Sequence, residues 1–176
     1  LGIEFDASTD FTLSASVFKN DVKNLIARKN KDDIYRNIEE AEFKGFECGF
    51  NWSMSSIFTL QSYYTYLESK DKTSITQDSV SYRPKHKIDL SGIVSLPADI
   101  LLSVNLSSVS SQTYYDGDEA KKLDPFAVLD MKMSKSLGKS LSVHLTVKNL
   151  FDKNYYESEG NPRPGRMVYA GLSATL

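Results

Sequence analysis

The sequence has few of the features that mark the common protein classes. Its 176 residues contain one cysteine, Cys48, so an internal disulfide is excluded. No apolar run approaches the roughly 20 residues that a transmembrane helix needs, and no basic segment followed by an apolar one marks a signal peptide. A net charge of −2 and a pI near 5.7 offer no electrostatic basis for binding nucleic acid. The composition alone is that of an ordinary soluble protein.

Helical spacing of apolar residues is also missing, and strict alternation takes its place. In the segment 141–148, Leu141, Val143, Leu145 and Val147 alternate with Ser142, His144, Thr146 and Lys148. A period of two predicts a strand with one apolar and one polar face. The same pattern recurs in segments 11–17, 46–54, 88–96, 100–107 and 170–176. We therefore predict an all-β protein.

The expected connections alternate in length. Short turns are predicted at 9–10, 55–56, 98–99 and 138–139, and long polar loops at 27–34, 71–83, 116–124 and 152–164. Outer-membrane barrels combine short periplasmic turns with longer extracellular loops, and apolar-out with polar-in alternation. This pattern favours an antiparallel transmembrane β-barrel. A soluble antiparallel sheet with one buried face remains the alternative, because it shows the same alternation.

Alternation also assigns side chains to faces, because a slip of one residue would invert every face. We predict that a set of apolar residues faces lipid: Phe46, Cys48, Phe50, Trp52, Leu102, Val104, Leu141, Val143, Leu145, Leu172 and Ala174. A polar set should face the lumen: Ser103, Asn105, Thr146, Lys148 and Ser173. Aromatic residues near the strand ends favour aromatic girdles at the two membrane interfaces. Their high β propensity is the alternative explanation. These residues are Phe11, Trp52, Phe58, Tyr63, Tyr64, Tyr66, Tyr114, Tyr115 and Phe126.

No segment has the spacing of a catalytic or metal site. His86 and His144 lack neighbouring histidine, cysteine or paired carboxylates at ligand spacing, and no serine lies in a nucleophile elbow or an SxxK motif. Asp116, Asp118 and Glu119 cluster in one loop without the rest of an EF-hand pattern, so solvated loop charge is the simpler interpretation. We therefore predict no enzymatic activity, no metal site and no cofactor.

The segment 147–172 resembles the C-terminal end of TonB-dependent outer-membrane receptors. Its Asn149-Leu150-Phe151-Asp152 motif is followed by an aromatic pair, Tyr155 and Tyr156, and by a Pro164-Gly165-Arg166 entry into the last strand. Upstream, segments 35–47, 82–90 and 123–134 are similar to further strands of the family, so the resemblance spans essentially the whole chain. It extends to Tyr35, Asn37, Ala41, Gly45 and Glu47 in the first of these segments.

We interpret the motif residues as structural. Asp152 and Asn154 are suited to bond the backbone where a strand turns into a loop. Pro164 and Gly165 are suited to set a bend, and Arg166 is expected at the outer rim, where a cation can meet phosphate-bearing lipid.

The resemblance implies energy-coupled uptake of a scarce nutrient across the bacterial outer membrane. Receptors of this family commonly bind ferric siderophores, and some bind cobalamin or haem. An N-terminal plug fills a barrel of about 22 strands and receives energy from the TonB complex. Implied partners are therefore a ferric siderophore or similar small ligand, outer-membrane lipid and lipopolysaccharide, and the TonB complex through a missing N-terminal region. A passive porin remains the alternative.

Under this resemblance, residues 1–176 would form the last nine or so strands of the barrel, with the plug and the first strands absent. The strand before the 9–10 turn is too short to cross a membrane, and the strand count is odd, so we expect no closed barrel from this segment alone. The family usually ends on an aromatic residue, and Leu176 in that position leaves the efficiency of assembly open.

The best candidates for ligand contact lie in the long loops and their flanks. They are Tyr114, Tyr115, Asp116, Tyr155 and Tyr156. Tyrosine combines flat apolar area with a hydroxyl group at low entropic cost, which suits a broad polar ligand.

Overall fold

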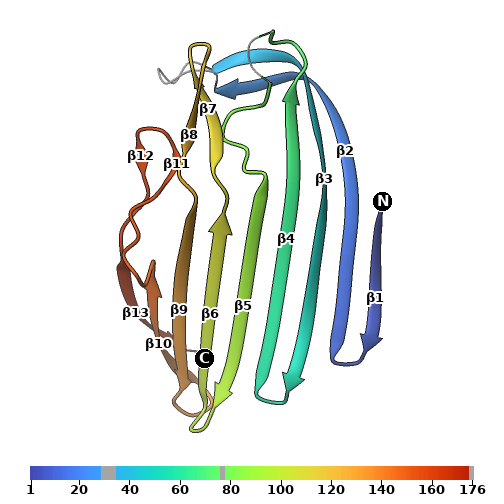
Figure 1. Ribbon diagram of the computed structural model, residues 1–176. Coiled ribbons are helices and arrows are strands. Elements are labelled where there is room, and N and C mark those ends of the chain that lie inside the picture. The colour runs from blue at the N-terminus through green and yellow to red at the C-terminus, as the bar shows by residue number, and fades with distance from the viewer. Residues whose placement is uncertain (29–34, 76–77, 175–176) are drawn as a thin grey trace.

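The computed structural model describes residues 1–28, 35–75 and 78–174. Nine strands form one antiparallel sheet in the order β1-β2-β3-β4-β5-β6-β9-β10-β13 (Figure 1). Their bounds are β1 Gly2–Ser8, β2 Phe11–Arg28, β3 Tyr35–Ser55, β4 Phe58–Asp71, β5 His86–Leu96, β6 Ile100–Val109, β9 Phe126–Ser136, β10 Leu141–Lys148 and β13 Met167–Ala174. No helix within the described ranges is long and apolar enough to cross a membrane. The all-β prediction is confirmed.

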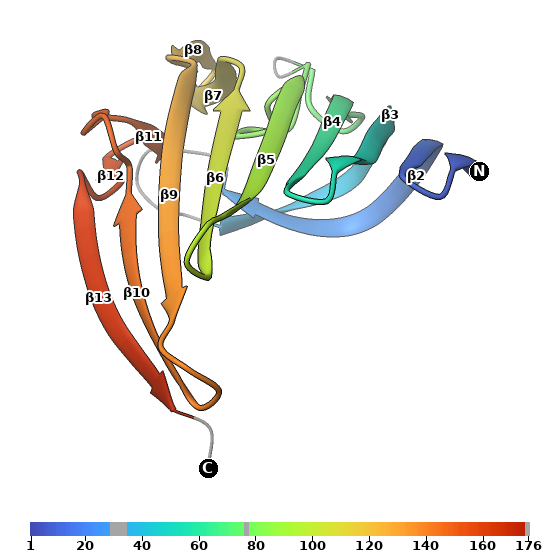
Figure 2. The same cartoon turned by 90° about the horizontal axis from the view of Figure 1, so that it is seen from below.

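The sheet is curved and open. Figure 2 shows it as an arc, with β1 at one end and β13 at the other. Each of these two strands pairs with one neighbour in the described structure, β1 with β2 and β13 with β10. The segment is therefore part of a barrel wall, as predicted.

The predicted alternation of short and long connections holds among the described residues, with corrections. Of the predicted 27–34 loop, residues 27 and 28 belong to β2, and residues 29–34 lie outside the described residues. Tight turns join β1 to β2, β3 to β4, β5 to β6 and β9 to β10, all at the lower end in Figure 1. The segment 116–124 is not an extended loop, because most of it is strand β8 (Glu119–Leu123), which pairs with β7 (Gln112–Asp116). Gly117, with φ of +65°, occupies the turn of this hairpin, where a left-handed backbone suits glycine. A second small hairpin, β11 (Tyr156–Ser158) with β12 (Asn161–Pro162), lies between β10 and β13.

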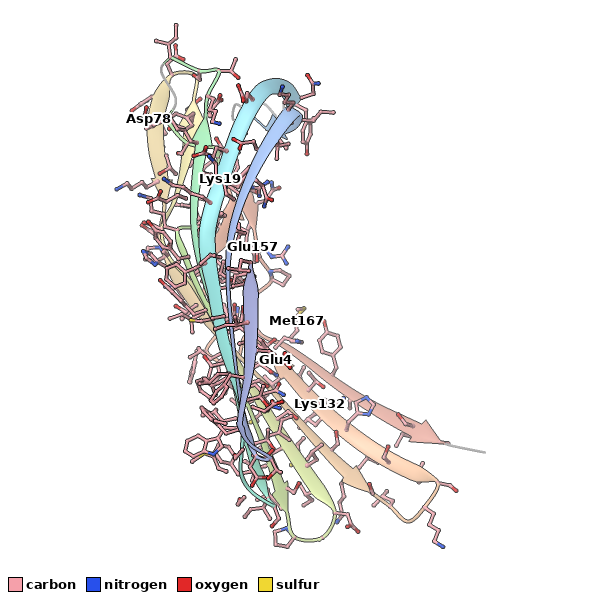
Figure 3. All side chains as sticks on the ribbon, turned by 90° about the vertical axis from the view of Figure 1, so that its right-hand side faces the viewer. Glu4, Lys19, Asp78, Lys132, Glu157 and Met167 are labelled. Carbon is pink, nitrogen blue, oxygen red and sulfur yellow. The ribbon has the colours of Figure 1, made fainter. Side chains whose placement is uncertain are left out.

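The strand registers place the predicted apolar set on one continuous face. Directly opposed residues share a face, and the pairs Leu13–Phe50, Trp52–Leu60, Val94–Leu102, Val104–Met131 and Leu145–Ala170 carry the apolar row across the sheet. The polar set lies on the other face, through pairs such as Asn105–Asp130 and Ser103–Lys132. Glu4 and Lys132, labelled in Figure 3, belong to this polar face in β1 and β9.

Four aromatic residues differ from the girdle prediction: Tyr114 and Tyr115 are buried in the β7–β8 hairpin, and Tyr63 and Phe126 lie on the polar face. Tyr63 pairs with Gly49 and Asp89, which places it on the polar face, and Phe126 pairs with Val109 on that same face. Their neighbours in sequence decide this, because a strand residue next to an apolar-face residue must point the other way. Phe11, Trp52 and Phe58 do lie on the apolar face near the short turns.

The upper parts of β2 and β3 leave the wall and bend over the concave side (Figures 1 and 2). The register is interrupted at Asn24, whose φ of +56° departs from strand geometry. Val80, from the connection between β4 and β5, packs with Ala41 and Phe43 of β3 and with Leu25 of β2. This small cluster is the core beneath the bent hairpin.

Candidate functional site

Long connections at the upper end of the sheet pack against one another. The ring of Tyr114 in β7 stacks on Tyr82 of the β4–β5 connection, with centroids 5.6 Å apart and planes inclined by 8°. The backbone N–H of Tyr82 donates to the carbonyl of Thr113 at 2.9 Å. The hydroxyl of Tyr115 accepts from the backbone N–H of Ser79 at 3.2 Å. These contacts make one rigid unit from the β7–β8 hairpin and the connection below it.

This packing limits how the first three candidate residues can meet a ligand. The side chains of Tyr114 and Tyr115 are buried, with 7% and 5% of their surface exposed. Burial raises the pKa of Tyr114, and the nearby carboxylate of Glu159 acts in the same direction. Asp116 accepts a hydrogen bond from the ammonium group of Lys121 at 2.7 Å. The rings of Tyr114 and Tyr115 are therefore not freely exposed, and their predicted role in ligand contact stays a prediction.

The Asn149–Asp152 motif forms a tight corner at the upper end of β10. Asn149 has a φ of +50° and is 4% exposed. Its side-chain oxygen accepts from the backbone N–H of Lys153 at 2.8 Å, and its amide nitrogen donates to the carbonyls of Lys153 and Pro164 at 2.9 and 3.1 Å. Asparagine suits the position, because it tolerates a left-handed backbone and supplies both a donor and an acceptor.

The other motif residues close the same corner from the side of β13. Asp152, at φ +54°, accepts from the backbone N–H of Arg166 at 2.7 Å. A Cβ atom on Gly165 would lie 2.6 Å from the carboxylate of Asp152, so a larger residue there would have to displace this carboxylate from the N–H of Arg166. The guanidinium of Arg166 lies 3.5 Å from the carbonyl oxygen of Leu150. The structure thus joins both ends of the 152–164 connection.

A hollow of about 560 Å³ lies on the polar, concave face below this corner. We call it the luminal hollow. Its charged lining is Asp89, Asp130, Lys148, Glu157 and Arg163, and its aromatic lining is Tyr63, Phe126, Tyr155 and Tyr169. The ring of Tyr155 packs on Phe126 at 4.4 Å between centroids. Lys148 pairs with Asp130 at 2.7 Å, and Asp130 also accepts from the backbone N–H of Asn149 at 2.8 Å.

The five candidate residues are divided between two places. Tyr155 lines the luminal hollow, and Tyr156, 38% exposed, begins the β11–β12 hairpin beside it. Tyr114, Tyr115 and Asp116 lie in the β7–β8 hairpin instead. The luminal residues Tyr63, Tyr169 and Arg163 were not among the candidates. The strand alternation already placed the two tyrosines on the polar face, so that signal was available in the sequence.

The lining of the luminal hollow is polar, charged and aromatic. Among the described residues, no group of three or more histidine, cysteine, aspartate or glutamate side chains is arranged to hold a metal ion. The lining combines carboxylates, two cations and aromatic hydroxyl groups on rigid strands. Such a surface can hold a polar, partly aromatic molecule by hydrogen bonds and ring contacts.

Comparisons with known proteins agree on one family. Residues 1–150 match the family described as "TonB dependent receptor-like, beta-barrel". The vitamin B12 transporter BtuB of Photobacterium profundum is 28% identical over 165 residues, which cover 89% of this chain and 26% of that protein. The ferrioxamine B receptor of Salmonella typhimurium is 27% identical over 154 residues, covering 81% of the chain and 22% of the receptor. The chain therefore spans about a quarter of the length of the curated relatives it matches.

Solved structures of outer-membrane receptors share the fold of this chain. The ferric enterobactin receptor PfeA of Pseudomonas aeruginosa superposes with a TM-score of 0.79 at 21% identity, covering 98% of this chain and 30% of that one. The ferric-catecholate import receptor Fiu of Escherichia coli gives a TM-score of 0.76 at 19% identity, covering 96% and 26%. At these identities the likeness concerns the fold.

Proposed function

Since this chain belongs to the TonB-dependent receptor β-barrel family, we propose that the protein carrying it takes up a ferric siderophore through the outer membrane with energy from TonB. The family consists of receptors and transporters of the Gram-negative outer membrane, and the chain is a wall segment of such a barrel. The family match over residues 1–150 is the observation that carries the proposal.

The choice of a siderophore follows from the relatives. The matched proteins include a ferrioxamine B receptor, a catecholate siderophore receptor and a metal-pseudopaline receptor. Two other relatives are a vitamin B12 transporter and a haem/haemopexin utilisation protein. Cobalamin and haem are therefore the second and third candidate ligands for the protein that carries this chain.

The site supports binding at the mouth and passage through the lumen. Tyr155 and Tyr156 lie where the β11–β12 hairpin meets the luminal hollow, and this position supports the proposal that they contact a ligand entering from the loop side. The polar lining below them would hold the ligand by interactions weak enough to be exchanged during transport. We include Tyr114, Tyr115 and Asp116 as the packed frame of this mouth.

The remaining parts of the receptor are also proposed. Further strands of the same protein would pair with the open edges of β1 and β13 and close the barrel, and a plug would occupy its lumen. TonB would act on that plug. Residues 1–176 are then the C-terminal portion of the barrel, which accords with coverage of about a quarter of each relative.

Uptake of labelled ligand by cells tests this function. A strain lacking the full-length receptor should lose accumulation of its ⁵⁵Fe-siderophore, and the receptor gene should restore it. Accumulation should also stop when TonB is deleted, because energy coupling distinguishes this family from passive diffusion. A panel of catecholate and hydroxamate siderophores, cobalamin and haem identifies the ligand. Uptake that persists without TonB would show a porin and contradict the proposal.

A further inference from the structure

The β11–β12 hairpin forms the loop-side wall of the luminal hollow. Tyr155 and Arg163 flank the two strands of the hairpin, Glu157 lies within β11, and all three residues line the hollow. The backbone N–H of Arg163 donates to the carbonyl of Tyr155 at 3.0 Å, and Glu157 pairs with Arg163 at 3.4 Å. The hairpin is therefore held together internally, and its tilt over the sheet decides where Tyr155 and Tyr156 lie.

The base of this hairpin packs against the sheet. The ring of Tyr155 lies on the ring of Phe126, the first residue of β9, with centroids 4.4 Å apart. The β7–β8 hairpin ends at Leu123, shortly before Phe126 in the chain. The two hairpins therefore rise from neighbouring points at the upper end of the sheet (Figure 1).

The tip of the β11–β12 hairpin is also held, because β11 contacts β8 of the neighbouring hairpin. Glu159, half-buried in the turn of the β11–β12 hairpin, accepts a hydrogen bond from the hydroxyl of Tyr114 in β7. Burial and the charge of this carboxylate both raise the pKa of Tyr114, so the hydroxyl keeps its proton and stays a donor at neutral pH. We call the contact between Glu159 and Tyr114 the hairpin clasp.

Tyr114 is itself fixed from the other side. It is 7% exposed, and its ring stacks on Tyr82 of the β4–β5 connection. Tyr82 has a φ of +60°, a left-handed conformation that is costly for a bulky residue and persists only where the surroundings hold it. The hydrogen bond from the N–H of Tyr82 to the carbonyl of Thr113 adds to this hold. The Tyr114 hydroxyl is therefore a firm point of attachment for the tip of the β11–β12 hairpin.

We propose that Tyr114 and Glu159 are positioning residues, whose clasp holds the β11–β12 hairpin over the luminal hollow and so places Tyr155 and Tyr156 for the ligand. With its base on Phe126 and its tip on Tyr114, the hairpin cannot swing outward, and the mouth of the hollow keeps its width. This inference rests on the proposed function, which assigns ligand contact to Tyr155 and Tyr156. Opening the clasp should let a bound molecule leave faster while the strands below stay intact.

Two single variants of the full-length receptor and their combination test the clasp. Tyr114→Phe removes the hydroxyl but keeps the ring that stacks on Tyr82, and Glu159→Leu removes the acceptor. In the receptor without ligand, hydrogen exchange of the amides 156–161 should become about fivefold faster in each variant, because one hydrogen bond is lost. Stopped-flow fluorescence with ferrioxamine B and ferric enterobactin as probes should show about fivefold faster dissociation and little change in association. The combined variant should do no more than either single one, since both changes open the same contact.

Glu119→Leu is the matched control, because it makes the same change on an exposed side chain of β8 and should leave exchange and dissociation as in the wild type. Unchanged exchange at 156–161 in both single variants would overturn the inference, and so would additive effects in the combined variant. A lowered midpoint of global unfolding for Tyr114→Phe would assign its hydroxyl to overall stability and also contradict the clasp. Uptake that does not need TonB would sink the proposed function alone, since exchange in the receptor without ligand reports only on the clasp.

Discussion

Asn149 holds the corner at which the chain leaves β10. One side chain there makes three hydrogen bonds, two to Lys153 and one to the carbonyl of Pro164, and its backbone is left-handed. Because Asn149 is buried, the backbone groups of Lys153 and Pro164 that it binds could not form hydrogen bonds with water if the side chain were removed. The corner therefore depends on a single residue more than the strands around it do.

We expect Asn149→Ala to destabilise the full-length receptor by about 2 kcal/mol or more, from unsatisfied buried groups and a strained alanine. Denaturant unfolding in detergent measures this loss, and faster tryptic cleavage at Lys153 reports the opened connection. Asn154→Ala is the matched control, because that neighbouring side chain is exposed and should change stability by less than about 0.5 kcal/mol. Equal stability of the two variants would contradict the role of Asn149.

Strands approach one another closely at several glycines, and Gly45 and Gly171 do so for different reasons. A Cβ atom on Gly45 of β3 would overlap the carbonyl oxygen of Tyr66 in β4, which is backbone. A Cβ atom on Gly171 of β13 would overlap the ring of His144 in β10, which is a side chain able to rotate. The first clash can be relieved only by moving a strand.

Gly45→Ala should therefore cost about 3 kcal/mol, and Gly171→Ala only about 1 kcal/mol, in unfolding measurements on the full-length receptor. Adding His144→Ala should remove the cost of Gly171→Ala, because it removes the obstructing ring. No single side-chain change should rescue Gly45→Ala. A larger loss from Gly171→Ala, or no rescue by His144→Ala, would show that the His144 ring is not the obstacle that sets the cost at Gly171.

We expect the tyrosines of the two hairpins to act differently: those at the β11–β12 hairpin contact the ligand, and those of the β7–β8 hairpin hold the neighbouring connection in place. Tyr155→Ala/Tyr156→Ala should weaken binding of the ferric siderophore about tenfold, because aromatic anchors carry much of such an interaction. Titration of the purified receptor followed by tryptophan fluorescence measures the affinity. Tyr64→Ala, on the apolar face, is the control and should bind the ligand as the wild type does.

Tyr114→Ala/Tyr115→Ala should also lower affinity, and for a different reason. The packed unit with Tyr82 and Ser79 would loosen, so trypsin should cleave faster at Lys85, at the end of the connection that this unit holds. Affinity and uptake that are unchanged in both double variants would argue against a role of these loops in ligand binding.

The two faces of the whole sheet meet different solvents. Val104, on the apolar face, is opposed by Gly92 and Met131, and its neighbour Asn105, on the polar face, is opposed by Ser91 and Asp130. Val104→Arg should destabilise the full-length barrel by about 2–4 kcal/mol, the cost of a cation near the middle of the bilayer. Asn105→Arg should cost much less, because it gains Asp130 and meets water. Unfolding in lipid vesicles measures both, and reversed costs would invert the assignment of faces.

The sheet as a whole has two open edges, at β1 and at β13. Ile3 and Phe5 on β1, and Val168 and Leu172 on β13, are more than 60% exposed in this segment. Unpaired backbone groups in hydrocarbon cost several kcal/mol each, so neither edge can face lipid unpaired. Pairing of both edges with further strands is the proposed solution, and it is the reason the tests above use the full-length receptor.

The sequence by itself determined the strands, their two faces and the alternation of turn lengths. Side chains at i and i+2 share a face for steric reasons that are local to each strand, so the rows at 100–107 and 141–148 could be assigned without knowing any partner. The Asn149–Asp152 motif was likewise visible, since left-handed corners favour asparagine and aspartate.

Only the tertiary structure decided what these local elements build together. Stacking of Tyr82 on Tyr114 and pairing of Glu42 with Lys19 and Lys72 join residues far apart in the chain, and no local preference specifies such contacts. The burial of Tyr114 and Tyr115 depends on how the long connections fold over the end of the sheet. The alternation in the sequence predicts the face of the sheet on which a side chain lies, whereas long-range packing determines which residues it contacts.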